Sequence, residues 1–250
     1  AIGIIGLFSI VCLMIILKEW AALARLARID TLHQEAEQVI AENDLTAARL
    51  FIKKLQALYG ARDNASWGSQ KLEEAAAEAF DADTLLTYAE DTLMSPLDGQ
   101  ATREIEAAAR QVATATALVP LAFADVLVAL TTNLRMIRRI CEIYGGRSGA
   151  LGGWRLTRAV ITHLVATGAV AVGDDLISSV GGGHLVSKIS RRFGEGLVNG
   201  ALTARVGIAA MEVCRPLPFS EGRKPRVTGV IRRALTGLFD RTSDEPASST

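Results

Sequence analysis

The stretch GLVNGALTARVGIAAMEV, residues 196–213, is long, apolar and rich in small residues. Gly196 and Gly200 stand four residues apart, and Gly207 lies seven residues further on, so a helix places all three on nearly the same face. Glycine inside a helix costs about 1 kcal/mol relative to alanine. Close approach of a second helix is the usual compensation for that cost. The stretch therefore predicts a helix that packs through Gly196, Gly200 and Gly207.

The composition extends this helical expectation to the whole chain. Half of the 250 residues are hydrophobic, 5% are aromatic and 22% are charged, and the mean hydropathy is +0.27. A mixture dominated by Ala, Leu, Val and Gly suits close-packed helices better than a β-rich core, so we expect an all-α fold. The 27 Lys and Arg residues balance the 27 Asp and Glu residues. No overall basic field indicates a nucleic-acid partner.

The N-terminal segment AIGIIGLFSIVCLMIIL, residues 1–17, contains no charged residue. Its length is at the lower limit of about 17–25 residues for a transmembrane helix. Because the chain begins with Ala1 rather than Met, we expect a span that is truncated at its start. A signal peptide would instead need a basic preceding region and a small-x-small cleavage site. The charged Lys18 and Glu19 and the interfacial aromatic Trp20 follow the segment, which favours a membrane anchor.

Charge and cysteine usage predict where the remaining chain lies. Lys18, Arg25 and Arg28 follow the apolar segment, so by the positive-inside rule the chain beyond them faces the cytoplasm. The cysteines are too widely spaced for a CxxC pair, which indicates a reducing compartment and inert buried thiols. These cysteines are Cys12, Cys141 and Cys214.

We expect the chain to divide into a transmembrane helix (1–17), a helical cytoplasmic arm (18–111), a Gly/Ala-rich helical domain (112–219), and an amphipathic basic helix with a disordered tail (220–250). In the arm, the apolar periodicity predicts a helical hairpin broken at Asn43 and Asp44, then two shorter helices that stop before Pro96. One long helix is expected from Gly99, capped by Asp98, to about Tyr144, with a kink at Pro120.

For two apolar segments, the sequence allows either a membrane or a protein environment. Residues 112–134 are a possible further span, although an ionised Asp125 would cost at least about 2.5–3.5 kcal/mol at the bilayer centre. Val227–Phe239 forms a basic amphipathic stripe. A helix of this kind lies on an anionic membrane surface, docks on a partner or packs back on its own domain.

Motifs of enzyme chemistry are weak in this sequence. It contains no GxxxxGK[ST] loop, so the chain is not itself a P-loop NTPase. A polar cluster worth a metal or acid–base hypothesis comprises His163, Asp174, Asp175 and His184, but its spacing does not fit one face of a helix. Buried histidines and helix-capping carboxylates that satisfy one another are the alternative. We expect no catalytic residue, no cofactor and no metal ion, and hence a protein that is not an enzyme.

Basic residues late in the chain allow two interpretations. Arg191, Arg192, Arg205 and Arg215 are an anion-binding strip or, as is commoner for such a set, solvated or salt-bridged side chains.

Three stretches resemble a helical domain of unknown function in YcjF-type bacterial inner-membrane proteins. They are ALVPLAFADVLVALTTNLRMIRRICEIYG (117–145), GWRLTRAVITHLVATGAVAVGDDL (153–176) and SRRFGEGLVNGALTARVGIAAMEVCRPLPF (190–219). The last is the most specific, because composition alone would not place its Gly, Asn, Thr, Arg and Arg-Pro residues. The resemblance covers residues 1–219 and is strong over 112–219.

The resemblance implies a protein of the bacterial inner membrane with N-terminal spans, one of them before Ala1, and a cytoplasmic C-terminal region. It also implies a YcjX-type P-loop NTPase as a partner and a link to envelope stress, and it transfers no catalytic residue. The leading hypothesis is a non-enzymatic membrane adaptor whose partners are the lipid bilayer and that NTPase. A membrane-remodelling or pore-forming helical protein is the alternative, and a hydrolase using His163, Asp174 and Asp175 is a third hypothesis.

Overall fold

The computed structural model describes residues 13, 14, 17, 27–59, 63–118, 122–146, 150–167 and 189–239. Regular secondary structure in these ranges is helical, which confirms the expected all-α fold. Apart from residues 13, 14 and 17, which are helical, the expected transmembrane segment 1–17 lies outside the described residues. The expected disordered tail beyond residue 239 lies outside them as well.

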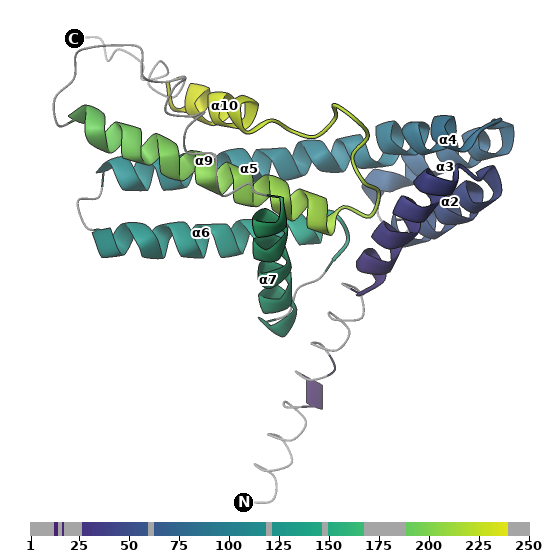
Figure 1. The fold of residues 1–250 in the computed structure, drawn as a ribbon, viewed down its shortest axis with the longest axis horizontal. Coiled ribbons are helices and arrows are strands. Elements are labelled where there is room, and N and C mark those ends of the chain that lie inside the picture. Colours follow the sequence, from purple (N-terminus) through teal and green to yellow (C-terminus); the bar gives the residue numbers. More distant parts are fainter. Residues whose placement is uncertain are drawn as a thin grey trace, which may run out of the picture.

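Two groups of helices stand side by side along the longest axis of the molecule (Figure 1). The first, here called the hairpin unit, comprises a helix over residues 27–42, α2 (Leu45–Tyr59), α3 (Asp63–Glu78), α4 (Ala82–Ala89) and the π-helix η1 (Glu90–Met94). The second, here called the bundle, comprises α5 (Ser95–Leu118), α6 (Ala122–Ile143), α7 (Ala150–Ala166), α9 (Ile189–Cys214) and α10 (Val227–Phe239).

The hairpin unit begins as the sequence predicts. Asn43 adopts a left-handed φ of 51°, which ends the helix over residues 27–42. The Asp44 Oδ1 atom then accepts a hydrogen bond of 2.8 Å from the Thr46 N–H, which caps α2. The core of the hairpin unit is formed by apolar side chains that include Phe51, Ile52, Leu55, Leu72 and Leu85.

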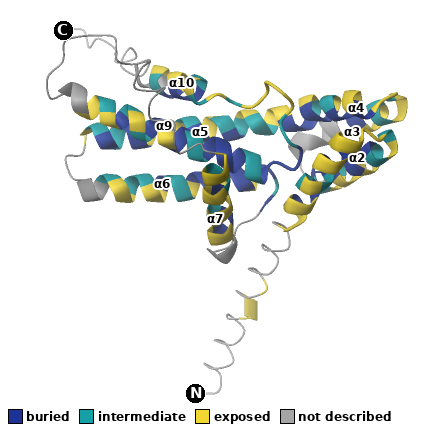
Figure 2. Cartoon of the chain, in the orientation of Figure 1, coloured by how far each residue is buried: buried dark blue, intermediate teal, exposed yellow. Residues whose placement is uncertain are grey.

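The bundle is built around α5 and α9, which run antiparallel and are in extensive contact (Figure 1). Many of the side chains between them are small: Ala101, Ala108 and Ala109 on α5, and Ala201, Ala204 and Ala210 on α9. Figure 2 shows buried residues along the facing sides of these helices and exposed residues on their outer faces. Small side chains allow two helix backbones to approach closely, so α5 and α9 form the centre of the bundle.

The single long helix expected from Gly99 to Tyr144 is wrong. α5 ends at Leu118, and α6 begins at Ala122 and returns antiparallel to α5 (Figure 1). Pro120 lies between them, and a proline ring clashes with the preceding helical turn. Folding back also lets both halves bury apolar faces against α9, which a straight helix would not allow.

The expected helix stop before Pro96 is also wrong, because η1 joins α4 to α5 without a break. The Ser95 N–H donates to the Glu90 carbonyl, which is the five-residue step of a π-helix. This wider turn precedes Pro96, whose ring would otherwise crowd the carbonyl four residues earlier. The π turn keeps the helix continuous and turns Glu90 toward the bundle.

The boundary between arm and domain, expected after residue 111, falls inside α5. The core around α9 begins as early as Ala101, so the first half of α5 belongs to the bundle. α10 spans the range expected for the amphipathic basic helix. It packs back on its own domain, with Val230 and Ala234 buried and the Arg110 Nε–H donating to the Ala234 carbonyl at 2.7 Å.

One helical stretch in the described residues, Arg192–Cys214, is long and apolar enough to cross a membrane by length and composition alone. Its most apolar window is 56% buried inside the molecule. Because the core helix of a soluble protein meets the same criterion, this stretch alone does not define a span.

Candidate functional site

The glycines of α9 lie against α5. A Cβ atom added to Gly196 would stand 2.6 Å from the carbonyl oxygen of Ala113, and one added to Gly200 would stand 3.1 Å from the Ala113 Cβ atom. A Cβ atom on Gly207 would stand 2.6 Å from the Ile105 side chain. The structure thus places Gly196, Gly200 and Gly207 on the α9 face that contacts α5, where a larger side chain would collide with the neighbouring helix.

A buried arginine joins the hairpin unit to the bundle. Arg215 follows the last turn of α9, and none of its side chain is exposed. Its Nη2 atom donates to Glu90 Oε1 at 2.8 Å and to Asp98 Oδ2 at 3.0 Å, and its Nε atom donates to Asp98 Oδ1 at 3.0 Å. The guanidinium also lies 4.1 Å from the centroid of the Phe219 ring. Paired carboxylates offset the cost of removing this charge from water.

The Arg215 cluster extends through two tyrosines. The Tyr144 hydroxyl donates to Asp98 Oδ1 at 2.5 Å, and the Tyr59 hydroxyl donates to the Tyr144 carbonyl at 3.0 Å. Burial raises the pKa of Tyr144, and the neighbouring Asp98 carboxylate raises it further. Tyr144 therefore stays protonated and serves as a permanent donor. Asp98 was expected to cap a helix, but it lies inside the first turn of α5 and binds Arg215 and Tyr144 instead.

The segment after α9 closes over the Arg215 cluster. The Ser220 hydroxyl donates to Glu90, and the Arg223 Nε atom lies 3.6 Å from Glu90 Oε2. From the hairpin unit, His33 Nδ1 donates to the Arg215 carbonyl at 2.7 Å. A carbonyl can only accept, so this contact places a proton on His33 Nδ1. The hairpin unit and the segment after α9 are therefore both connected to the Arg215 cluster by hydrogen bonds and ion pairs.

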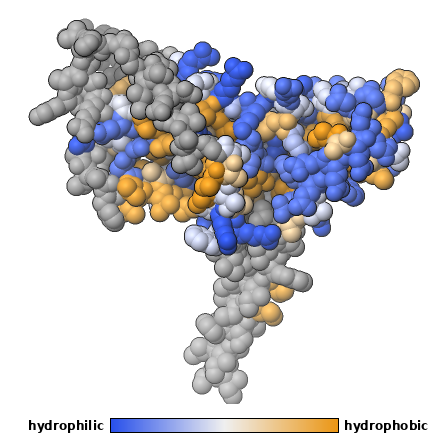
Figure 3. All heavy atoms as spheres, viewed as in Figure 1, coloured by the Kyte–Doolittle hydropathy of each residue, from blue (hydrophilic) through white to orange (hydrophobic). Residues whose placement is uncertain are grey.

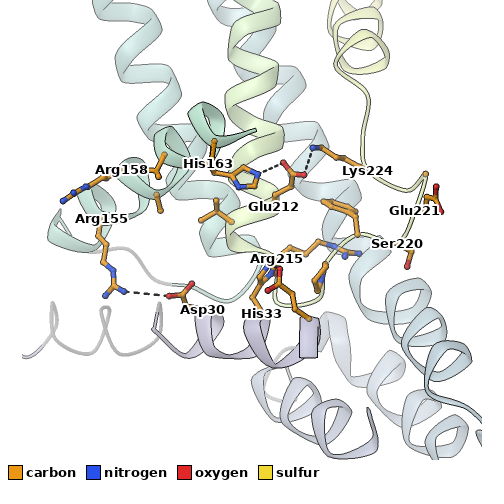
Figure 4. A pocket seen from close by; sticks show the side chains of 18 residues that line it. Asp30, His33, Arg155, Arg158, His163, Glu212, Arg215, Ser220, Glu221 and Lys224 are labelled. Carbon is orange, nitrogen blue, oxygen red and sulfur yellow. Dashed lines mark hydrogen bonds and ion pairs between the residues drawn. The ribbon is translucent and has the colours of Figure 1, made fainter. Parts of the chain in front are cut away.

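A cleft of about 1020 Å³ opens beside the Arg215 cluster, between the helix over residues 27–42, α7, the end of α9 and the segment after it (Figure 4). Its walls carry charges of both signs. The cationic or titratable groups are Arg155, Arg158, Lys224, His33 and His163, and the acidic groups are Asp30, Glu37, Glu212 and Glu221. Such a lining fits a ligand that also carries both charges rather than a simple anion.

Several charged groups of the cleft pair with one another across its walls. His163 Nε2 donates to Glu212 Oε2 at 3.1 Å, and Lys224 Nζ lies 2.5 Å from Glu212 Oε1 (Figure 4). Arg155 lies 4.0 Å from Asp30. These pairs join α7 to α9 and α7 to the hairpin unit.

Of the polar cluster predicted from the sequence, the structure describes only His163. Asp174, Asp175 and His184 lie outside the described residues. The described partner of His163 is Glu212, which the sequence reasoning did not single out. Within the described residues, no group of three or more His, Cys, Asp or Glu side chains has the arrangement of a metal site.

Two of the widely spaced cysteines meet in the core. Cys141 on α6 and Cys214 on α9 are both buried free thiols, and their side chains are hydrogen-bonded to each other. This hydrogen bond and burial raise the pKa of Cys214, which keeps it a thiol. The pairing was not visible in the sequence, and Cys12 lies outside the described residues.

The fold and the site define an all-helical protein in which a hairpin unit and a glycine-packed bundle are held together by a buried arginine cluster. The model of the domain of unknown function DUF697 matches residues 80–240. The chain belongs to the UPF0283 family of membrane proteins, which confirms the YcjF-type resemblance. No solved structure matches the chain.

Relatives match along nearly the whole chain. The UPF0283 membrane protein of Mesorhizobium japonicum is 39% identical over 249 residues, which cover 100% of this chain and 69% of the relative. That of Rhizobium etli strain CFN 42 is 40% identical over 231 residues, covering 92% of this chain and 64% of the relative. The UPF0283 membrane protein of Bradyrhizobium diazoefficiens is 39% identical over 250 residues, which cover 98% of this chain and 72% of the relative. The chain thus spans about two thirds of the length of the first two relatives.

Proposed function

We propose that this chain is a membrane-anchored, non-enzymatic adaptor that holds a YcjX-type P-loop NTPase at the bacterial inner membrane during envelope stress. The observation that carries the proposal is the cleft between the hairpin unit, α7 and the segment after α9. Its size and its mixed charge suit a segment of a partner protein.

The lining of the cleft supports a docking role over a catalytic one. Small-molecule sites are mostly apolar cavities of about 300–1,000 Å³ with a few convergent polar groups. This cleft, at about 1020 Å³, lies just above that range, and its charges are spread over four separate segments. Glu212 pairs with both His163 and Lys224, so three of the charged or titratable groups of the cleft already bind one another. A charged protein surface would engage such a lining at several points at once.

The anchor follows from the N-terminal sequence and from family membership. An uncharged segment over residues 1–17 followed by Lys18, Arg25 and Arg28 would leave the hairpin unit and the bundle in the cytoplasm. A cytoplasmic NTPase would then meet the cleft without crossing the membrane. The resemblance to YcjF-type proteins supplies the NTPase class.

The test is direct binding between the purified, detergent-solubilised full chain and a purified YcjX-type NTPase from the same bacterium. Arg158→Glu reverses an exposed charge on the cleft wall. We expect this variant to weaken binding by about tenfold or more, because like charges facing each other across an interface cost several kcal/mol. Titration with a labelled NTPase gives the dissociation constant.

Arg103→Glu is the matched control, because Arg103 is exposed on α5 and does not line the cleft. This control should bind like the wild type, and both variants should unfold at the wild-type temperature. If the wild-type chain does not bind the NTPase, the adaptor proposal fails. Equal weakening by both variants would show that the cleft is not the docking site.

A further inference from the structure

Apolar side chains cover the end of the bundle that is remote from Arg215, here called the distal end. It comprises the last turns of α5, the first half of α6 and α9 from Ile189 to Leu202 (Figure 1). The exposed apolar residues come from all three helices: Leu118, Val126, Leu127, Leu130, Phe193 and Leu202. Leu130 is 53% exposed and Leu118 is 74% exposed. Figure 3 shows hydrophobic side chains gathered over α6 at the lower left of the molecule.

Three polar side chains between the helices of the distal end bond to one another. The Thr116 hydroxyl donates to Asp125 Oδ1 at 2.5 Å, and Asn199 Nδ2 donates to Asp125 Oδ2 at 3.2 Å and to Thr116 at 3.1 Å. The cost that Asp125 would carry in lipid is therefore reduced by two donors inside the bundle. On the outer side of α6, the Thr131 hydroxyl donates to the Leu127 carbonyl at 2.7 Å, so this group is also satisfied within its own helix.

Along α5 and α9, the half of the bundle near Arg215 has apolar residues inside and charged residues outside. Ile105 and Met211 are buried there, and Arg103 and Glu104 are exposed. A surface with apolar groups outside and paired polar groups inside suits lipid, whereas the reverse suits water. We propose that the distal end of the bundle inserts into one leaflet of a lipid bilayer, as a membrane contact separate from the N-terminal anchor.

Charge along α6 sets the depth of this insertion. From Ala122 to Arg135, the first exposed arginine after the apolar turns, α6 rises ~20 Å. One leaflet contributes ~15 Å of hydrocarbon. Arg135, Arg138 and Arg139 are all exposed on α6, and they would lie at the level of anionic headgroups. This length places the apolar turns of α6 in one leaflet.

Three observations favour lipid over a protein as the partner of the distal end. The relatives are membrane proteins, the polar groups at this end are satisfied internally, and exposed arginines border the apolar turns. Two charged residues of α9 at this end, Arg192 and Glu195, are exposed, and each interacts with another group of the protein. The insertion does not depend on the NTPase, so it stands or falls separately from the adaptor role.

The test places an environment-sensitive NBD probe on single cysteines in the full chain. Cys12→Ser removes the one thiol outside the described residues, while the buried Cys141 and Cys214 do not react in the folded protein. Leu130→Cys and Leu202→Cys put the probe on the distal end, and Glu104→Cys is the control on the opposite half of α5. The protein is reconstituted into vesicles of phosphatidylethanolamine and phosphatidylglycerol, with and without lipids brominated in their acyl chains.

Probes at positions 130 and 202 should emit at shorter wavelength and lose intensity with brominated lipids, while the probe at position 104 is unchanged. Quenching by acyl-chain bromine requires lipid contact, so burial by a protein partner or a second copy would not produce it. If the distal probes behave like the control probe, the insertion is excluded. The Cys12→Ser variant without an added cysteine must take up no probe. This result shows that Cys141 and Cys214 stay buried and hence that the protein is folded.

Discussion

At the residue scale, Arg215 has the largest structural role. Its charge is fully buried and meets Glu90 and Asp98, whereas the sequence grouped it with Arg191, Arg192 and Arg205 as an anion-binding strip or a salt-bridged set. The salt-bridged interpretation holds for Arg215. Its partners could not be named from one sequence, because they lie 125 and 117 residues away.

Arg215→Met should lower the free energy of unfolding by about 3–5 kcal/mol, because Glu90 and Asp98 would stay buried without their cation. Chemical denaturation in detergent measures the change. Arg103→Met, on the exposed side of α5, should change it by no more than about 0.5 kcal/mol. Adding Glu90→Gln and Asp98→Asn to Arg215→Met should recover part of the loss. A loss for Arg215→Met no larger than that of Arg103→Met would contradict the buried ion pair.

A second prediction at the residue scale concerns Asp81. Its carboxylate accepts hydrogen bonds from the N–H and the hydroxyl of Thr84 at 2.7 and 2.9 Å, which caps α4 and lowers the pKa of Asp81 below its ordinary 3.8. A lowered pKa stabilises the folded state above the unfolded-state pKa, and this contribution is lost as pH falls through the folded-state pKa. Asp81→Ala should therefore destabilise the protein at neutral pH.

The difference between Asp81→Ala and the wild type should shrink as the pH falls below 3.8 and reach its minimum below the lower folded-state pKa, where both states bind the proton. Urea unfolding at a series of pH values measures it, with Glu104→Ala as the exposed carboxylate control. A difference that stays constant through this range would mean that the cap does not depend on the charge of Asp81.

At the element scale, the close contact between α5 and α9 depends on which glycines of α9 face α5. Gly194 and Gly196 both lie inside α9, but a Cβ atom on Gly194 meets nothing within 4 Å, whereas one on Gly196 meets the Ala113 carbonyl. Spacing in the sequence placed Gly196, Gly200 and Gly207 on one face. It could not name α5 as the neighbour, because Ala113 and Ile105 lie far from these glycines in the sequence.

Gly194→Ala and Gly196→Ala should change stability in opposite directions. Gly194→Ala should raise the free energy of unfolding by about 1 kcal/mol through helix propensity. Gly196→Ala should lower it by about 1–3 kcal/mol, because the added methyl collides with the α5 backbone. Thermal or denaturant unfolding of the two variants in the same detergent is the measurement. Stabilisation by both variants would show that α9 does not approach α5 this closely.

At the scale of the whole molecule, the chain presents a mixed-charge cleft at one end of the bundle and an apolar surface at the other. An adaptor would use the cleft for a partner and the distal end for lipid. The pore-forming alternative needs the bundle to cross the bilayer. α9 is long and apolar enough to do so, but 56% of its most apolar window is buried inside the molecule, and the apolar part of α6 is about one leaflet long.

The full chain reconstituted into vesicles should therefore release no trapped dye, since insertion into one leaflet leaves the other intact. Fluorescence of a self-quenched dye measures release, with detergent lysis as the full signal and protein-free vesicles as the baseline. Dye release above that baseline would favour the pore-forming alternative over the adaptor.

Periodicity and composition by themselves determined the all-α class, the break at Asn43, the glycine face of α9 and the range of α10, because each depends on neighbours within a few turns. The tertiary structure alone decided that residues 95–143 fold back as α5 and α6, that Pro96 sits within a continuous helix, and that Arg215 meets Glu90 and Asp98. These outcomes depend on which apolar faces bury one another and on charges brought together over long separations. A single sequence does not encode such pairings in its local pattern.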